Sequence, residues 1–384
     1  MSTIVIAPFN VANFPEGGGH FWVYMQYVQG FRQQGCDVYW LEQFVSSGDK
    51  TRDEYMLAQF AERMEHFGLK GKSILYTMAE RSTGSNAAPV FIGTEQSAAM
   101  AVLRKADLLV NFHYAMDPAM LAEFRQTVLI DIDPGLLQLW IDEGQLHVSR
   151  HDYYCTIGEH IAAPPANGLP WISIRPPVSL EHWPYRHQTN AQDFTTISSW
   201  WGGGGRGEFV AESNGQFYEN NKRITFLEYI DLPQRTSQTF ELALNLGPGD
   251  TEDRDNLLAH NWKITDPYNV ADSPAAYQSY IQNSRGEFGC AKPSYLKFQN
   301  AWVSDRTVCY LASGKPVVVQ DTGPSSYLPD GAGMFRFSTM EDAVDAFDTI
   351  NADYAKHCKA AREIAEAYFD SSKVAATILS GCQL

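Results

Sequence analysis

Short apolar runs along the chain alternate with stretches whose apolar residues have helical spacing. Runs rich in β-branched and aromatic residues predict buried strands at 4–7, 36–41, 73–76, 108–112, 128–132, 153–157, 171–174, 194–198, 240–244, 286–290 and 316–320. Helices are predicted between many of them, for example over 54–67, 97–105 and 304–311. Because strand and helix alternate, we expect parallel sheets covered by helices on both faces.

The alternation is interrupted once, near the middle of the chain. Residues 176–195 are proline-rich and polar, as in a linker, and residues 340–379 read as almost continuous helix. We therefore expect an α/β protein of two Rossmann-like, doubly wound domains that face a cleft, with a long C-terminal helical tail. The expected bounds are 1–188 and 189–360, with 361–384 crossing back to the first domain. Ligands of such sheets bind beyond the carboxyl ends of the strands.

Composition narrows the functional classes. The chain has 384 residues, the length of two or three domains, and a formal charge of -16 from 29 Lys and Arg against 45 Asp and Glu. This charge argues against a protein whose main partner is a nucleic acid backbone. The six cysteines are scattered without zinc-ligand spacing, and no apolar run approaches the ~18 residues of a membrane helix. With no signal-peptide pattern at the start, we expect a cytoplasmic protein with no bound metal or cofactor.

A candidate phosphate site opens the helix predicted after residue 303. Ser304 is a good N-cap, and a helix N-terminus offers free N–H groups to an anion. Arg306 in the first turn opposes the helix dipole, which a bound diphosphate would explain. A plain capped helix with a paired surface arginine is the alternative.

The same region carries a family resemblance. Residues 309–318, CYLASGKPVV, resemble the EAMACGxPVV element of GT-B glycosyltransferases, notably the retaining, family 4-like ones. Residues 302–304 stand where those enzymes carry an EGFG turn. Four further segments resemble a bacterial and phage branch of this fold whose acceptors are mostly unassigned: 17–20, 36–42, 284–288 and 320–323. The resemblance spans nearly the whole chain. It implies a metal-independent, retaining transfer of a hexosyl or pentosyl group from a nucleotide-sugar co-substrate to a sugar, lipid-linked or small-molecule acceptor.

On the donor side, the resemblance implies diphosphate binding by Lys222, which opens a predicted helix, together with Arg306. The family's second basic residue is replaced by Phe217, so Arg206 is a further donor candidate. Without the resemblance, the pair Lys222-Arg223 would be interpreted as the solvent-exposed start of a helix.

The family glutamate that binds the donor ribose falls at Cys309, and a thiol cannot replace a carboxylate in this role. Asp305, one helical turn earlier, is the expected substitute, and Ser304 and Thr307 complete the donor set. Alternatively, Asp305 only favours the positive end of the helix.

Two residues are candidates for catalysis. Glu287 is the nearest match to the glutamate that retaining enzymes place near the transferred sugar; a structural pair with Arg285 or Arg306 is the alternative. His20 is a candidate general base, because imidazole titrates near neutral pH, and a histidine packed at a helix start is the alternative.

Acceptor binding is expected from the first half of the chain. Gly18 and Gly19 let the backbone approach a ligand, and His113, Asp131 and Asp133 follow predicted strands. Gln138 and Glu159 are weaker candidates of the same kind. Taken singly, each of these polar residues also fits a turn or surface role.

Three other functions share the resemblance. A nucleotide-sugar epimerase or phosphorylase would keep the phosphate pocket, and a degenerate GT-B protein would bind sugars or partners without turnover. A phage-type enzyme acting on modified nucleic acid bases is disfavoured, but not excluded, by the acidic charge.

Overall fold

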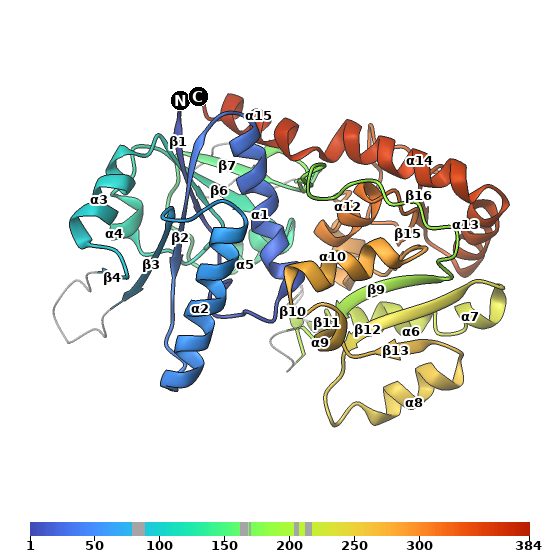
Figure 1. The fold of residues 1–384 in the computed structure, drawn as a ribbon. Coiled ribbons are helices and arrows are strands. Elements are labelled where there is room, and N and C mark those ends of the chain that lie inside the picture. The colour runs from blue at the N-terminus through green and yellow to red at the C-terminus, as the bar shows by residue number, and fades with distance from the viewer. Residues whose placement is uncertain (79–88, 162–167, 169, 203–206, 212–216) are drawn as a thin grey trace.

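The computed structural model describes residues 1–78, 89–161, 168, 170–202, 207–211 and 217–384 of the chain. Within them lie two large sheets, each flanked by helices (Figure 1). The predicted Arg206 lies outside the described residues.

The first sheet has the strand order β4-β3-β2-β1-β5-β6-β7-β8, parallel except where β4 runs against β3. Its strands are β1 (Thr3–Ala7), β2 (Asp37–Gln43), β3 (Ser73–Met78), β4 (Pro89–Ile92), β5 (Leu108–Asn111), β6 (Thr127–Asp131), β7 (Tyr153–Thr156) and β8 (Ile172–Ser173). The central strands β1, β5 and β6 are buried along their whole length. Burial on both faces explains their unbroken apolar sequence.

The second sheet has the order β13-β12-β9-β14-β15-β16, and all its pairs are parallel. Its strands are β9 (Asp193–Ser199), β12 (Thr239–Asn245), β13 (Lys263–Thr265), β14 (Gly286–Gly289), β15 (Val317–Gln320) and β16 (Met334–Phe337). A separate antiparallel hairpin, β10 (Phe209–Ala211) with β11 (Phe217–Glu219), follows β9.

Helices cover both sheets. The first half holds α1 (Gly18–Gln33), α2 (Lys50–His66), α3 (Gln96–Lys105), α4 (Pro118–Leu121) and α5 (Leu136–Asp142). The second half holds α6 (Lys222–Glu228), α7 (Leu232–Arg235), α8 (Thr251–Ala259), α9 (Pro267–Val270), α10 (Pro274–Asn283), α11 (Pro293–Phe298) and α12 (Asp305–Ala312). The tail is α13 (Met340–Ala352), α14 (Tyr354–Ile364), the π-helical turn η2 (Ala365–Phe369) and α15 (Ser371–Gly381).

The tail passes from the second sheet to the first. Helix α14 packs on α12, whereas α15 packs on α1 (Figure 1). A Cβ at Gly30 of α1 would lie 2.3 Å from the carbonyl oxygen of Ser371, so a glycine is needed for this close approach. Next to it the linker and the tail run together, because the Val178 N–H donates to Phe369 and the Ser371 N–H donates to Val178.

The N-terminus of α1 contacts the second half of the chain. The Gly18 N–H donates to the Ala271 carbonyl at 3.1 Å, and Nε1 of Trp22 donates to the Pro274 carbonyl at 2.9 Å. In each sheet the strand order reverses beside the first strand of that half, between β1 and β5 and between β9 and β14. The loops that leave β1 and β9 at these switch points border one cavity, where a ligand is expected.

Candidate active site

A cleft of about 560 Å³ separates the two halves of the protein. From the first half it is lined by the loop of Gly17, Gly18, Gly19 and His20 that starts α1. From the second half it is lined by the end of β9 and by the first residues of α6 and α12. A volume of this size accommodates a nucleotide or a drug-sized ligand.

Arg306 is held rigidly at the floor of the cleft. Its Nε donates to Oε1 of Glu287 at 2.7 Å, and its Nη1 donates to the Ile197 carbonyl at 2.8 Å. The buried Glu287 carboxylate raises the pKa of Arg306, so the guanidinium stays charged. Nε and Nη1 are thus both engaged inside the protein, while Arg306 also lines the cleft.

Glu287 itself does not line the cleft. Its side chain on β14 is fully buried, and it reaches the cleft only through Arg306. The geometry therefore matches the structural Glu–Arg pair more closely than a glutamate that faces a sugar. In this arrangement Glu287 is a positioning residue.

Lys222 is the second cation of the cleft. It opens α6, and its amine makes no ion pair with another residue of the described chain. Burial, together with the positive charges of Arg306 and Lys292, lowers the pKa of Lys222 to about 7. Two neighbouring cations that repel each other are expected where an anion binds between them.

The start of α12 completes this part of the cleft. The Ser304 hydroxyl accepts the Arg306 N–H at 3.2 Å, as an N-cap does, and Ser304 and Asp305 both line the cavity. Cys309 is buried, and its thiol donates to the Asp305 carbonyl. Asp305 is therefore the carboxylate that this helix presents to the cleft.

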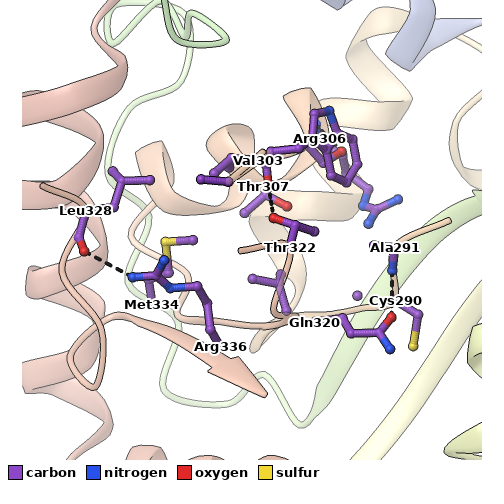
Figure 2. A pocket seen from close by; sticks show the side chains of 15 residues that line it. Cys290, Ala291, Val303, Arg306, Thr307, Gln320, Thr322, Leu328, Met334 and Arg336 are labelled. Carbon is purple, nitrogen blue, oxygen red and sulfur yellow. Dashed lines mark hydrogen bonds between the residues drawn. The ribbon is translucent and has the colours of Figure 1, made fainter. Parts of the chain in front are cut away.

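Thr307 points to a different cavity, behind α12. Figure 2 shows this space, which also contacts Gln320 and Arg336 and has a volume of about 20 Å³. That is room for about one water molecule, far too little for a nucleotide. The expected donor role of Thr307 is not supported by its position, since Thr307 does not line the cleft that Lys222 lines.

His20 stands at the opposite wall, in the first turn of α1. Its Nε2 lies 2.7 Å from the Phe9 carbonyl oxygen, which can only accept, so Nε2 carries the proton. Burial lowers the pKa of His20, so the ring is neutral near pH 7 and Nδ1 keeps its lone pair. The structure thus provides the tautomer that a general base requires.

A second cavity, of about 590 Å³, adjoins the cleft within the first half. The two cavities share His20, Val23 and Asp133, so they lie side by side with these three residues between them. The predicted His113 lines the second cavity, with its ring centroid 5.1 Å from that of Phe9. The other contributors are mainly aromatic.

The two aspartates after β6 have different surroundings. Asp133 lines both cavities, and its Oδ1 accepts the Tyr295 hydroxyl at 3.1 Å. Asp131 is fully buried and lines neither. It accepts hydrogen bonds from Gln138, from Thr156 and from the Asp133 N–H, and burial raises its pKa to about 7. Asp131 therefore holds the turn that presents Asp133, and its expected contact with the acceptor is not supported.

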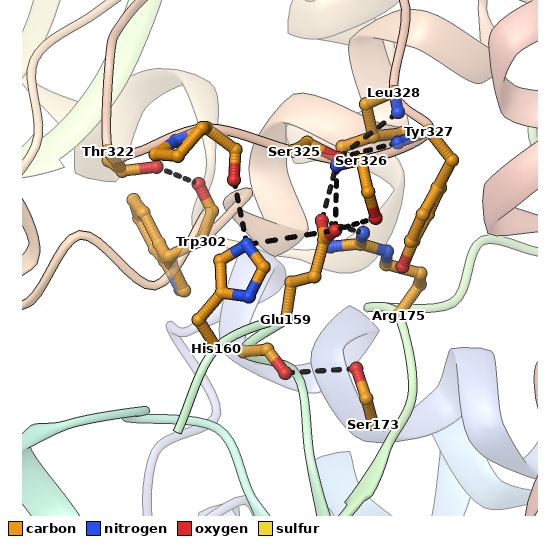
Figure 3. Close-up of polar contacts among 12 residues, drawn as sticks. Glu159, His160, Ser173, Arg175, Trp302, Thr322, Ser325, Ser326, Tyr327 and Leu328 are labelled. Carbon is orange, nitrogen blue, oxygen red and sulfur yellow. Dashed lines mark hydrogen bonds and ion pairs between the residues drawn. The ribbon is translucent and has the colours of Figure 1, made fainter. Parts of the chain in front are cut away.

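Glu159 belongs to a polar cluster that joins the two halves (Figure 3). Its carboxylate accepts from Arg175 at 2.7 Å, from the Ser325 hydroxyl at 2.7 Å and from the Ser326 N–H at 2.8 Å. These bonds lower the pKa of Glu159 to about 2. The Arg175 guanidinium also lies 4.1 Å from the Tyr327 ring centroid. We call this set the Glu159 cluster; its role is to hold the halves together.

Several cleft residues were not found by sequence reasoning. Asn245, Tyr268 and Tyr277 come from β12, α9 and α10, and no motif marks them. Tyr24 of α1, which no motif marks either, is buried and lines the second cavity. The helical spacing of Tyr24 predicts burial but cannot reveal that one edge borders a cavity.

Comparison with solved structures identifies the architecture. An alpha-glucosyltransferase (AGT) in complex with UDP aligns over 100% of both chains at 12% identity, with a TM-score of 0.61. Anabaena HepE in complex with UDP and glucose aligns over 100% of both chains at 13% identity, with a TM-score of 0.57. AviGT4, a glycosyltransferase involved in avilamycin A biosynthesis, aligns with 100% of this chain and 97% of its own at 12% identity, with a TM-score of 0.55.

The fold is GT-B. This confirms the predicted α/β class with paired Rossmann-like sheets. No protein-family model and no curated protein sequence matches the chain. The family 4 assignment and the retaining outcome stay predictions.

Two structural features are absent from the described residues of the chain. In that part of the GT-B chain, no group of three or more His, Cys, Asp or Glu side chains is arranged to hold a metal ion. Nor does any helix there have the length and apolar character needed to cross a bilayer.

Proposed function

We propose that this GT-B protein is a glycosyltransferase that moves a sugar from a UDP-sugar to an acceptor held by the first half of the chain. The observation that carries the proposal is the convergence of Lys222, Arg306 and the N-terminus of α12 on one cleft. The fold neighbours support the choice of nucleotide, since AGT was solved with UDP and HepE with UDP and glucose.

The cations act on the leaving group. As the bond from the anomeric carbon to the diphosphate breaks, negative charge grows on the diphosphate oxygens. Lys222, Arg306 and the free N–H groups of α12 are in place to stabilise that charge before the reaction begins. This supply of positive charge from the chain supports a metal-independent transfer.

A transferase explains the second cavity better than an epimerase or a phosphorylase does. The second cavity adjoins the donor cleft at His20, Val23 and Asp133, which leaves room for a second substrate close to the transferred sugar. An epimerase needs no such site, and a phosphorylase needs only room for phosphate.

For the stereochemical outcome we propose retention, which rests on the family 4-like motif. The neutral His20, with a free Nδ1 at the junction of the cavities, favours a second candidate, base-assisted inversion. The anomeric proton coupling in the NMR spectrum of the glycoside product distinguishes the two.

The test is a binding and turnover experiment on the full chain. Calorimetric titration with UDP, GDP, ADP and dTDP should show the tightest binding for UDP, and UDP-glucose or another UDP-hexose should be consumed with release of UDP. Absence of binding to all four nucleotides contradicts the proposal. Release of a 2-epimer or of sugar phosphate in place of a glycoside assigns the protein to a rival function.

A further inference from the structure

The cavity beside the donor cleft has a chemistry that selects its occupant. We propose that the acceptor is a small, uncharged aromatic alcohol, with one or two flat rings and a hydroxyl group at one end. This inference rests on the proposed function and adds the class of the second substrate.

The walls of the cavity are aromatic. Tyr24, Phe112, Tyr114 and Trp140 contribute rings to it, and Phe9 lies at the mouth with 52% of its surface exposed. A cavity of about 590 Å³ walled by rings suits a flat apolar ligand, because ring faces and edges pack favourably on one another.

The walls are also held in place without a ligand. The Tyr114 hydroxyl accepts the Ile132 N–H at 3.1 Å, and the rings of Tyr24 and Phe112 meet edge to face with centroids 5.2 Å apart. His20 meets Tyr24 in the same way at 5.2 Å. A preformed cavity avoids the cost of ordering side chains when the ligand binds.

Charge excludes other acceptor classes. None of the described residues that line the cavity is a Lys or Arg, and Asp133 is the one ionisable carboxylate among them. A phosphorylated or carboxylated acceptor would meet no cation there and would lie against that carboxylate. Transfer of such an anion from water without a partner is strongly unfavourable.

A free sugar is also a poor fit. Each of its hydroxyls needs a hydrogen-bond partner, and one left unpaired in an apolar cavity weakens binding. His20 and Asp133 line both the cavity and the cleft, whereas the rest of the cavity lining is mainly aromatic and aliphatic, with His113 and Gln145 as its further polar residues. The part lined by His20 and Asp133 suits one hydroxyl, with the apolar remainder of the acceptor on the rings.

The acceptor hydroxyl reacts where the cavity adjoins the cleft. Its oxygen forms a bond to the anomeric carbon while the bond from that carbon to the diphosphate breaks. The nucleoside diphosphate leaves with the electron pair of the broken bond, and its departing oxygen takes up the hydroxyl proton. Asp133, whose Oδ1 is engaged by Tyr295, can orient the acceptor hydroxyl with Oδ2.

The test measures binding of three probes to the full chain in the presence of saturating UDP: 2-naphthol, 2-naphthyl phosphate and methyl β-D-glucopyranoside. We expect 2-naphthol to bind at least tenfold more tightly than either of the others, by ligand-observed NMR titration. Equal or tighter binding of the phosphate or the glucoside overturns the proposal.

A pair of variants places the probe. Ala115 is exposed at the rim of the cavity, so Ala115→Trp should fill the entrance, lower the affinity for 2-naphthol at least tenfold and leave UDP affinity unchanged. Ala122→Trp, at an exposed position outside the cavity, is the control and should change neither. An unchanged 2-naphthol affinity in Ala115→Trp overturns the assignment. Failure of the wild type to bind UDP, with 2-naphthol still bound, would instead contradict the proposed donor site alone.

Discussion

The Nε atom of Arg306 lies 2.7 Å from Oε1 of Glu287, and the two side chains are only 8% and 0% exposed. The other carboxylate oxygen, Oε2, has no hydrogen-bond partner in the described part of the chain. A charge pair this deeply buried has lost its hydration, so each member depends on the other. Glu287 thereby sets the position of the cation that we assign to the donor diphosphate.

Loss of this buried carboxylate should be strongly destabilising. Glu287→Ala leaves the Arg306 guanidinium buried without a counter-ion, so we expect the free energy of unfolding to fall by about 3–5 kcal/mol, measured by urea denaturation. As a control, Glu341→Ala removes the carboxylate of the exposed ion pair with Arg235. This change should alter the free energy of unfolding by less than about 1 kcal/mol. Similar small effects in both variants would show that the buried pair is not needed for stability.

Removal of the Lys222 amine should weaken nucleotide binding. Lys222→Ala deletes a charged hydrogen bond to the diphosphate, so calorimetric titration with UDP should show a loss of about 1–3 kcal/mol. Lys50→Ala is the matched control, because the Lys50 side chain is 89% exposed on α2, away from the cleft. Wild-type affinity in Lys222→Ala would remove this residue from the donor site.

Donor binding should also depend on pH through Lys222. Its pKa of about 7 in the free protein means that the amine is increasingly neutral above that pH, while the bound diphosphate favours the protonated form. Affinity for UDP-glucose should therefore be highest below pH 7 and fall as pH rises towards 9, with proton uptake on binding. In Lys222→Met this dependence should disappear; a wild-type profile as flat as that of the variant would refute the assignment.

The Glu159 cluster should contribute to acid stability. The pKa of the Glu159 carboxyl is lowered from about 4.5 to about 2. The carboxylate therefore stabilises the folded protein above pH 4.5, and this contribution is lost as pH falls towards 2. Glu159→Gln should lower the free energy of unfolding at pH 7 by about 1–3 kcal/mol and flatten its decline between pH 4.5 and 2. If the free energy of unfolding of the variant declined between pH 4.5 and 2 as steeply as that of the wild type, other carboxylates would control acid stability.

The glycine loop should tolerate no side chain at its centre. A Cβ at Gly18 would lie 2.2 Å from the Ser273 carbonyl oxygen, so Gly18→Ala should force α1 away from α10 and cost about 1–3 kcal/mol of unfolding free energy. UDP affinity should fall with it, because the loop lines the cleft. Gly249→Ala, with nothing within 4 Å of the added methyl, is the control. Equal stability of the two variants would contradict the close contact seen here.

The sequence predicted the elements whose pattern is local. Strands β1, β5, β6 and β15 are short β-branched runs buried on both faces, and α12 follows a clear N-cap at Ser304. The edge strands β4 and β13 and the β10–β11 hairpin escaped notice, because partly exposed strands of three or four residues carry little periodic signal.

The site was predictable in its residues more than in its geometry. Lys222, Arg306, His20 and Asp133 all line the cleft, and their roles there stay predictions. That Asp131 is buried while Asp133 faces the cavity depends on the turn after β6, which residue types alone do not specify. The bond from Ser325 to Glu159 joins residues 166 positions apart, and only the assembled fold brings them together.

The contact between Val178 and the residues around Asp370 has a mechanical consequence. The chain crosses between its two halves at these segments, once in the linker and once in the tail, and the crossings are joined by two backbone hydrogen bonds of 2.7 and 3.0 Å. Two covalent connections that run together act as one hinge: the halves cannot slide apart or twist freely, and rotation about the paired segments is the motion that deforms the chain least. The cleft between the halves would then open and close while Val178 stays nearly still.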